Sequence, residues 1–169
     1  MNIDDINNLH IPNFIETFKN IFEKTESITK EVENLRPFKN KKHMIDSFLL
    51  IFDSLNLKKK LQIISKHPDL GDKIKINKGL TKLSQEEQSL AGLKDCNEDE
   101  FRLFNQLNSS FKLKFNIPFI YAVRDKNKDA IISEFKSRLI NSDINSEIDI
   151  SIEQVKRIAL LRLEQLIDG

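Results

Sequence analysis

Apolar residues recur three or four positions apart along most of this sequence, which is the spacing of one face of an α-helix. No segment shows the alternation of apolar and polar residues that a half-buried β-strand requires. We therefore expect an all-α protein with about seven or eight helices. The stripes that lead to this expectation are Ile11, Phe14, Ile15, Phe18, Ile21 and Phe22; Met44, Phe48, Ile51 and Leu55; Phe101, Phe104, Leu107, Phe111 and Phe115; Ile131, Phe135 and Leu139; and Ile148, Ile152, Val155, Ala159 and Leu166.

Residues that interrupt helices or favour strands are rare. The 169 residues include four glycines, four prolines and three valines, and valine is among the residues most enriched in strands. A chain of this length buries roughly 68–70% of the surface that it exposes when unfolded, so its core needs no disulfides. Because no linker, repeat or low-complexity tract divides the chain, we expect a single domain over residues 1–169.

Charge and cysteine content exclude several classes of partner. Lys and Arg total 27 and Asp and Glu total 26, which gives a net charge of +1. A strongly basic nucleic-acid binder carries a large excess of positive charge, so we expect no nucleic-acid partner. Cys96 is the single cysteine, which excludes an intramolecular disulfide and a cysteine-cluster metal site.

Targeting signals and membrane spans are also not found in the sequence. No apolar run approaches the ~20 residues that cross a bilayer, and the acidic start, Met1 to Asp5, lacks the basic and apolar regions of a signal peptide. The last three residues, Ile167 to Gly169, differ from the peroxisomal Ser-Lys-Leu signal. We expect a cytoplasmic protein with no membrane partner.

Two irregular stretches interrupt the helical pattern. Residues 67–82 are polar and hold one proline and two glycines, and irregular segments of this length are usually either functional or disordered. The second stretch, residues 116–120, begins with Asn116 at the end of the helix that Asn97 is placed to cap. Asn tolerates the left-handed conformation that ends helices, and Pro118 prevents continuation.

His67 is the histidine with the most distinctive position. It ends the helix predicted over residues 57–66 and precedes Pro68, whereas His10 and His43 lie before helices in polar surroundings typical of the surface. An imidazole has an ordinary pKa near ~6.5, which suits proton transfer at neutral pH. The alternative is that a charged His67 only complements the C-terminus of its helix.

Residues 84–88 allow two interpretations. Ser84 and Glu87 have the spacing of a capping box, in which each side chain bonds the backbone N–H of the other residue. Ser84, Glu87, Gln88 and Ala91 also share one helix face, which would present a hydroxyl, a carboxylate and an amide to a pocket. The spacing alone does not decide between a cap and a pocket wall.

The remaining residues supply no established catalytic motif. Arg162 lies between two leucines on the last predicted helix, and an arginine there often extends its charge from an apolar face to solvent. The sequence contains no phosphate-binding loop, dinucleotide fingerprint, zinc-protease motif or nucleophile elbow. We expect no nucleotide, metal or covalent nucleophile.

The order of short motifs over nearly the whole chain resembles one known family, the 2-oxo-4-hydroxy-4-carboxy-5-ureidoimidazoline (OHCU) decarboxylases of purine breakdown. The most specific part of the resemblance is a His-Pro-Asp-Leu-Gly run followed by Ser-x-x-Glu-Gln. The motifs are Arg36-Pro37-Phe38, His67-Pro68-Asp69-Leu70-Gly71, Ser84 to Gln88 with Ala91-Gly92-Leu93, Leu107-Asn108, Phe115 to Ile120, and Ile158-Ala159 with Arg162-Leu163. The sequence departs from the family at Asn116, where glycine is common, and at Asp72, where a small residue is more usual.

The resemblance implies an all-α fold, a homodimer, no cofactor, and decarboxylation of the small molecule OHCU to (S)-allantoin. It implies that His67 is the catalytic histidine and proton donor, and that Glu87 is a catalytic carboxylate in the pocket. The substrate-binding residues that it implies are Pro68, Ser84, Gln88, Ile120, Tyr121, Ala122, Val123, Arg124 and Arg162.

Two alternatives remain beside this interpretation. One is a non-enzymatic helical interaction module, in which Glu87 serves only as a cap. The other is a lyase on the same fold that acts on another small anionic ring substrate, since a fold alone does not fix a substrate. An interaction module needs no pocket, whereas the enzyme needs His67, Glu87 and Arg162 to converge within one cavity.

Overall fold

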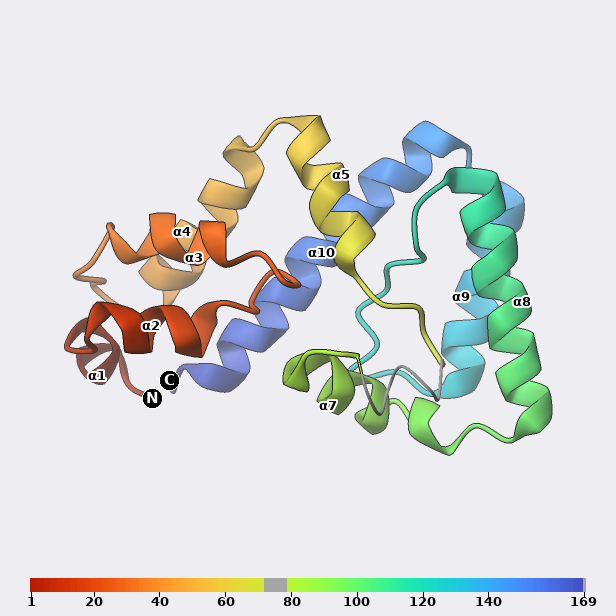
Figure 1. The fold of residues 1–169 in the computed structure, drawn as a ribbon, viewed down its shortest axis with the longest axis horizontal. Coiled ribbons are helices and arrows are strands. Elements are labelled where there is room, and N and C mark those ends of the chain that lie inside the picture. The colour runs from red at the N-terminus through yellow and green to blue at the C-terminus, as the bar shows by residue number, and fades with distance from the viewer. Residues whose placement is uncertain (72–78, 169) are drawn as a thin grey trace. The chain divides into compact units, whose positions relative to one another are not determined.

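The structure is a computed structural model that describes residues 1–71 and 79–168. Within these residues all regular structure is helical, and nine α-helices and one short 3₁₀ helix are present (Figure 1). The all-α class is therefore confirmed, with one or two helices more than expected. The helices are α1 Ile3–Asn7, α2 Ile11–Phe18, α3 Glu26–Glu33, α4 Lys41–Ser54, α5 Leu57–Lys66, α7 Lys82–Leu90, η1 Leu93–Asp95, α8 Glu98–Phe115, α9 Lys128–Asn141 and α10 Ile144–Leu166.

The additional helices are short, which is why periodicity did not separate them. The five residues of α1 bury one apolar side chain, Ile6. A single buried residue cannot show the repeated spacing by which a helix is predicted. The start of α1 is fixed by a cap instead, since the side chain of Asn2 accepts a hydrogen bond from Asp5 N. No helix in the described part of the chain is long and apolar enough to cross a membrane.

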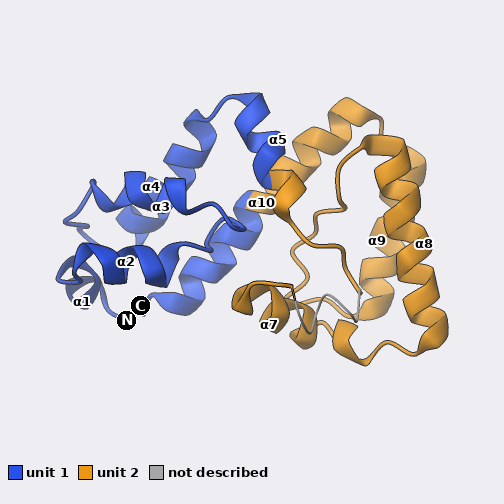
Figure 2. Cartoon of the chain, viewed as in Figure 1, with its two compact units in different colours: residues 1–63, 156–169 blue, residues 64–155 orange. Residues whose placement is uncertain are grey.

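The chain divides into two compact units (Figure 2). Unit 1 consists of residues 1–63 and 156–169, and unit 2 consists of residues 64–155. Helices α5 and α10 each contribute residues to both units. The single domain expected from the sequence stays a prediction.

Unit 1 is built around phenylalanines from its first helices. Phe18 of α2 lies 6.2 Å from Phe48 of α4, and Phe22 stacks on Phe52 at 4.7 Å between ring centroids. These four rings are fully buried. The stripes predict this for Phe18, Phe22 and Phe48, but Phe52 is buried although the stripe passes through Ile51, and Ile11 is exposed. The two ends of the chain meet in this unit, where the Met1 amino group donates to Leu166 O at 2.9 Å (Figure 1).

Unit 2 is built around α8 and α9. Phe119 stacks on Phe135 with 3.8 Å between ring centroids, and Phe111 meets both rings edge-on. The limits of α8 match the sequence prediction. Asn97 forms a capping box with Glu100, and Asn116 ends the helix with φ +56°. Asn116 thus adopts the left-handed conformation that the family's more common glycine also permits.

One buried ion pair connects α9 with α10 in unit 2. The Arg138 guanidinium pairs with the Glu147 carboxylate, and their side chains are 5% and 0% exposed. Arg138 Nε lies 3.1 Å from Oε1 of Glu147, and Ser151 donates a hydroxyl hydrogen bond to the same oxygen. Removing one partner of a buried pair leaves an uncompensated charge, which is strongly destabilising.

We predict that Glu147→Ala lowers the free energy of unfolding by about 3–5 kcal/mol, because Arg138 then stays buried without its carboxylate. Asp149→Ala is the control, since Asp149 is exposed on the same helix, and it should change stability by less than about 0.5 kcal/mol. Urea unfolding followed by far-ultraviolet circular dichroism measures both. Equal stability of the two variants would contradict a structural role for the pair.

Candidate functional site

His67 directly follows helix α5, as predicted. Its backbone N–H bonds Ile64 O at 3.1 Å, and the helix stops because Pro68 disfavours a helical conformation at the residue before it. The His67 side chain is buried, with 8% of the residue exposed. His10 is exposed at the start of α2, but His43 lies inside α4 rather than before it.

Residues 67–71, which we call the His67–Gly71 turn, are held by the amide of Gln88 on α7. Gln88 Oε1 accepts a hydrogen bond from Gly71 N at 3.1 Å, and Gln88 Nε2 donates to Asp69 O at 3.3 Å. Gln88 itself is 2% exposed. One buried side chain therefore fixes the main chain at two points of the turn.

A second attachment comes from one face of α8. Asn108 Nδ2 donates to Leu70 O at 2.9 Å, and Lys112 Nζ pairs with Asp69 Oδ2 at 2.6 Å. Gly71 has φ +73°, and a Cβ placed there would lie 2.7 Å from Cγ of Phe104. Only glycine combines this backbone conformation with so close an approach.

The inward face of α7 carries the predicted polar residues. Ser84, Gln88 and Ala91 are buried and Glu87 is half-buried, so these four residues share a face that turns toward the interior of unit 2. The predicted capping box of Ser84 and Glu87 is wrong. Thr81 is the N-cap, its side chain accepts from Ser84 N at 3.3 Å, and Ser84 is the third residue of the helix.

The cap at Thr81 removes the capping explanation for Glu87. A capping box needs the hydroxyl residue outside the helix and the carboxylate three positions later, and Glu87 lies six positions after Thr81. The sequence misled because both Thr81 and Ser84 are good caps, and only the backbone shows where the helix begins.

The segment Ile120 to Arg124 is irregular and fastened at its main chain. Arg138 Nη1 donates to Ile120 O at 2.7 Å, and Ala122 N donates to Gln154 Oε1 at 3.0 Å. The side chains of Ile120 and Val123 are buried. Those of Tyr121, Ala122 and Arg124 are partly exposed, and these three can offer side chains to a ligand.

Tyr121 remains a hydrogen-bond donor at neutral pH. Burial, with a contribution from the negative charge of Glu134, raises the pKa of its phenol above the ordinary value of 10.0, against a lowering contribution from Arg138. A phenol whose pKa is raised is protonated throughout the physiological range.

Arg138 is a supporting residue that the sequence analysis missed. Its guanidinium lies 4.3 Å from the centroid of the Phe119 ring and bonds both Ile120 O and Glu147. Arg138 and Glu147 are nine positions apart, on two different helices, so helical spacing did not pair them. Arg138 therefore holds the chain just where the predicted binding segment begins.

Arg162 belongs to unit 1, whereas the other predicted site residues belong to unit 2. The residue is 1% exposed, and its Nη1 bonds Asn20 O at 2.8 Å and Glu23 Oε2 at 3.1 Å. Arg162 is thus a buried, paired arginine rather than one that extends to solvent. These contacts do not test whether it binds substrate, and that role stays a prediction.

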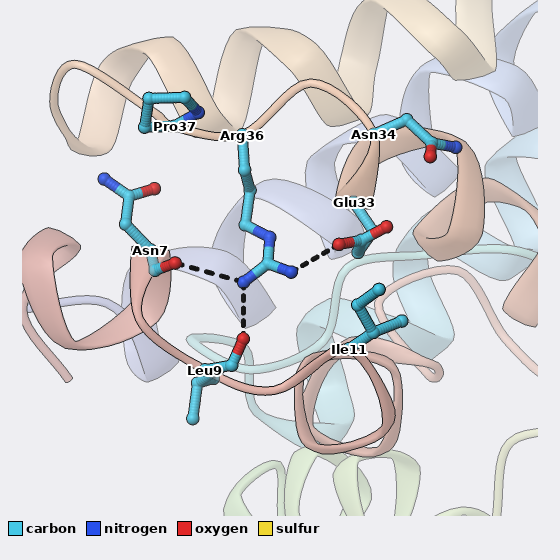
Figure 3. Close-up of a pocket in the computed structure, with 7 residues that line it drawn as sticks. All are labelled: Asn7, Leu9, Ile11, Glu33, Asn34, Arg36 and Pro37. Atoms are coloured by element: carbon cyan, nitrogen blue, oxygen red, sulfur yellow. Dashed lines mark hydrogen bonds and ion pairs between the residues drawn. The ribbon is translucent and has the colours of Figure 1, made fainter.

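A hollow of about 510 Å³ in unit 1 lies around Arg36 (Figure 3). Arg36 Nη1 donates to Leu9 O at 2.6 Å and to Asn7 O at 3.2 Å, while Nη2 pairs with Glu33. The guanidinium also covers the ring of Phe14 at 5.0 Å. The Arg36-Pro37-Phe38 motif therefore fastens the turn between α1 and α2 to the end of α3.

A metal site was not expected from the sequence. Among residues 1–71 and 79–168, no three His, Cys, Asp or Glu side chains gather as metal ligands, and Cys96 is buried. Asp72, the second departure from the family pattern, lies outside the described residues, as do residues 73–78 of the polar stretch predicted over 67–82. That no cofactor is needed stays a prediction.

Comparison with known protein families shows to which family the chain belongs. The sequence model of the family described as OHCU decarboxylase matches residues 7–164. The chain belongs to the OHCU decarboxylase family. The resemblance drawn from its motifs is confirmed.

Several named relatives match nearly the whole chain. A 2-oxo-4-hydroxy-4-carboxy-5-ureidoimidazoline decarboxylase of Amia calva is 33% identical, over 99% of this chain and 95% of that protein. Its counterpart in Xenopus laevis is 32% identical, over 96% and 93%. A uric acid degradation bifunctional protein of Bacillus sp. (strain TB-90) is 32% identical over 98% of this chain, which spans 32% of that longer protein.

Two solved structures share the fold of this OHCU decarboxylase family member. An (S)-allantoin synthase superposes with a TM-score of 0.76 at 20% identity, over 99% of this chain and 55% of that one. An OHCU decarboxylase crystallised in the presence of (S)-allantoin gives a TM-score of 0.71 at 20% identity, over 88% and 95%. The all-helical architecture is thus that of the family.

We predict that Thr81→Ala lowers the free energy of unfolding by about 1 kcal/mol, the ordinary cost of losing an N-cap. Glu87→Gln should cost less, because Glu87 takes no part in the cap of α7. Urea unfolding of the two single variants gives the comparison. A larger loss of stability in Glu87→Gln than in Thr81→Ala would contradict the assignment of the cap to Thr81.

Proposed function

We propose that this protein removes CO₂ from OHCU and gives (S)-allantoin, a step in urate degradation. Membership of the family supports the reaction. One observation links the proposed reaction to particular residues. His67 is buried, and it lies on a turn whose main chain is fixed by Gln88 and Asn108. An interaction module has no need of a buried, fastened imidazole, and nothing in the described residues favours another ring substrate.

The chemistry needs an electron sink and a proton. When the C–CO₂ bond breaks, CO₂ leaves and the bonding electron pair remains on the ring carbon, where the adjacent ring carbonyl delocalises it. A proton from His67 then forms the new C–H bond, and solvent returns a proton to the imidazole. Delivery from one side makes the product a single enantiomer, and a positioned proton donor contributes about 10²–10⁴-fold.

The residues of α7 supply the surroundings of that proton transfer in this proposal. Glu87 orients His67 or holds the hydroxyl and ureido groups of the substrate, and Ser84 and Gln88 hold its amides. Both atoms of the Gln88 amide bond the turn, but each retains capacity for a second hydrogen bond. Hydrogen bonds at the carbonyl stabilise the charge that develops there.

The other proposed substrate contacts are those of Pro68, the segment Ile120 to Arg124, and Arg162. Tyr121 contributes a phenol that stays protonated, and Arg138 fixes the segment at Ile120 O. Arg162 is proposed as the partner of the substrate's negative charge, because guanidinium–carboxylate pairs are strong. No cofactor takes part in this scheme, and the cytoplasm is the proposed location.

We predict that freshly generated OHCU gives (S)-allantoin faster with the protein than without it, by circular dichroism of the product. His67→Asn should slow this conversion by about 10²–10⁴-fold, because the proton donor is removed. His10→Asn, at an exposed histidine, is the matched control and should keep full activity. Wild-type rates in a folded His67→Asn variant would remove His67 from the mechanism.

A homodimer is the proposed assembly, on the strength of the family resemblance. Sedimentation equilibrium of the purified protein should give about twice the 19.7 kDa of one chain. A mass of one chain at micromolar concentration would contradict it.

A further inference from the structure

We infer that Asn108 is a positioning residue for the reaction: it fixes the turn that carries His67 by bonding the main chain of Leu70. This inference rests on the proposed function and deepens it. Asn108 is not among the residues expected to touch the substrate. It acts through the turn.

The contact is buried and directed at the backbone. Asn108 is 5% exposed, and its Nδ2 donates to Leu70 O at 2.9 Å. Leu70, three residues after His67, is 6% exposed. A buried main-chain carbonyl needs a partner, and Asn108 is that partner for Leu70 O.

The face of α8 that carries Asn108 follows the turn residue by residue. Phe104, Asn108 and Lys112 are spaced four apart and so lie on one face. They contact Gly71, Leu70 and Asp69 respectively, so the turn runs antiparallel to the helix axis along this face. Contacts at three successive turns of α8 fix the position of the turn relative to that helix.

Asn108 and Gln88 together complete the attachment. Gln88 bonds Asp69 O and Gly71 N, and Asn108 bonds Leu70 O between them. Three consecutive residues after Pro68 thus have a main-chain polar group bonded by a buried side-chain amide. The amides bond the backbone of the turn rather than its side chains. Bonds to the backbone fix the path of the chain that carries His67.

The other end of the Asn108 amide adds to the argument. Asn108 Oδ1 is buried and has no hydrogen-bond partner among the described residues. A buried polar atom without a partner is destabilising, but the Nδ2 end of the same amide satisfies the buried Leu70 O, which an apolar residue such as leucine would leave without this donor. An amide at this position therefore serves the placement of the turn more than the packing of α8.

Loss of the hydrogen bond from Asn108 to Leu70 O should lower the turnover rate. A small displacement of a catalytic group can cost about 10²-fold in rate, because proton transfer depends steeply on geometry. Substrate contacts made by other residues remain, so affinity is preserved. Asn108→Leu should therefore lower kcat at least tenfold and leave KM within about threefold of the wild-type value.

The experiment compares Asn108→Leu and Asn108→Asp with Asn105→Leu, an exposed control on the same helix. Steady-state rates with OHCU are normalised to the folded fraction seen by circular dichroism. The Asn105 variant should match wild type. A wild-type kcat in a folded Asn108 variant, or a loss expressed entirely in KM, would overturn the inference. Loss of folding in both Asn108 variants would also overturn it, because Asn108 would then be a structural residue.

A second readout does not depend on OHCU. The chain has three histidines, so their ring ¹H–¹⁵N resonances can be assigned by single substitutions. In Asn108→Leu the His67 resonances should shift or broaden, and those of His10 and His43 should not. If the wild type fails to decarboxylate OHCU, the proposed function fails, and unchanged His67 resonances would separately show that Asn108 does not position this ring.

Discussion

The arrangement depends on how the backbone after His67 is held against helix α8. Gly71 has no side chain, so the turn approaches the ring of Phe104 to a distance that a Cβ would not permit. At that distance the amides of Gln88 and Asn108 reach main-chain atoms of Asp69, Leu70 and Gly71. A close backbone approach and three hydrogen bonds thus convert an irregular segment into a fixed support for one imidazole. The proline that follows His67 ends α5 at the required residue.

Each of the two units contains a buried arginine that pairs with a fully buried glutamate. In unit 2 Arg138 pairs with Glu147 and holds Ile120 O. In unit 1 Arg162 pairs with Glu23 and holds Asn20 O. Buried pairs of this kind are costly to break and add little net stability, but both guanidiniums bond irregular main chain that a helix does not satisfy. For Arg138 this main chain is the start of the proposed binding segment.

The sequence predicts the parts of the structure that depend on local spacing. The stripe from Phe104 to Phe115 and the caps at Asn97 and Asn116 follow from residues within one helix of each other. The start of α7 was predicted wrongly, since Thr81 and Ser84 are both good caps and the backbone chose Thr81. Contacts between positions far apart in the chain could not be predicted from the spacing of residues in the sequence. Asn108 and Leu70 are 38 positions apart, and no periodicity links a helix face to the carbonyl of an irregular turn. Motif order predicts His67 and Glu87 as site residues, whereas the side chains that hold the turn after His67 needed the fold.

The central claim is that the His67–Gly71 turn presents its imidazole to the ligand. A crystal structure of this protein with (S)-allantoin tests it most directly. We predict that the His67 ring contacts the product at the carbon that receives the proton, while the hydrogen bonds from Gln88 and Asn108 to the turn are retained. Product bound away from His67, for example in the hollow around Arg36, would contradict the account.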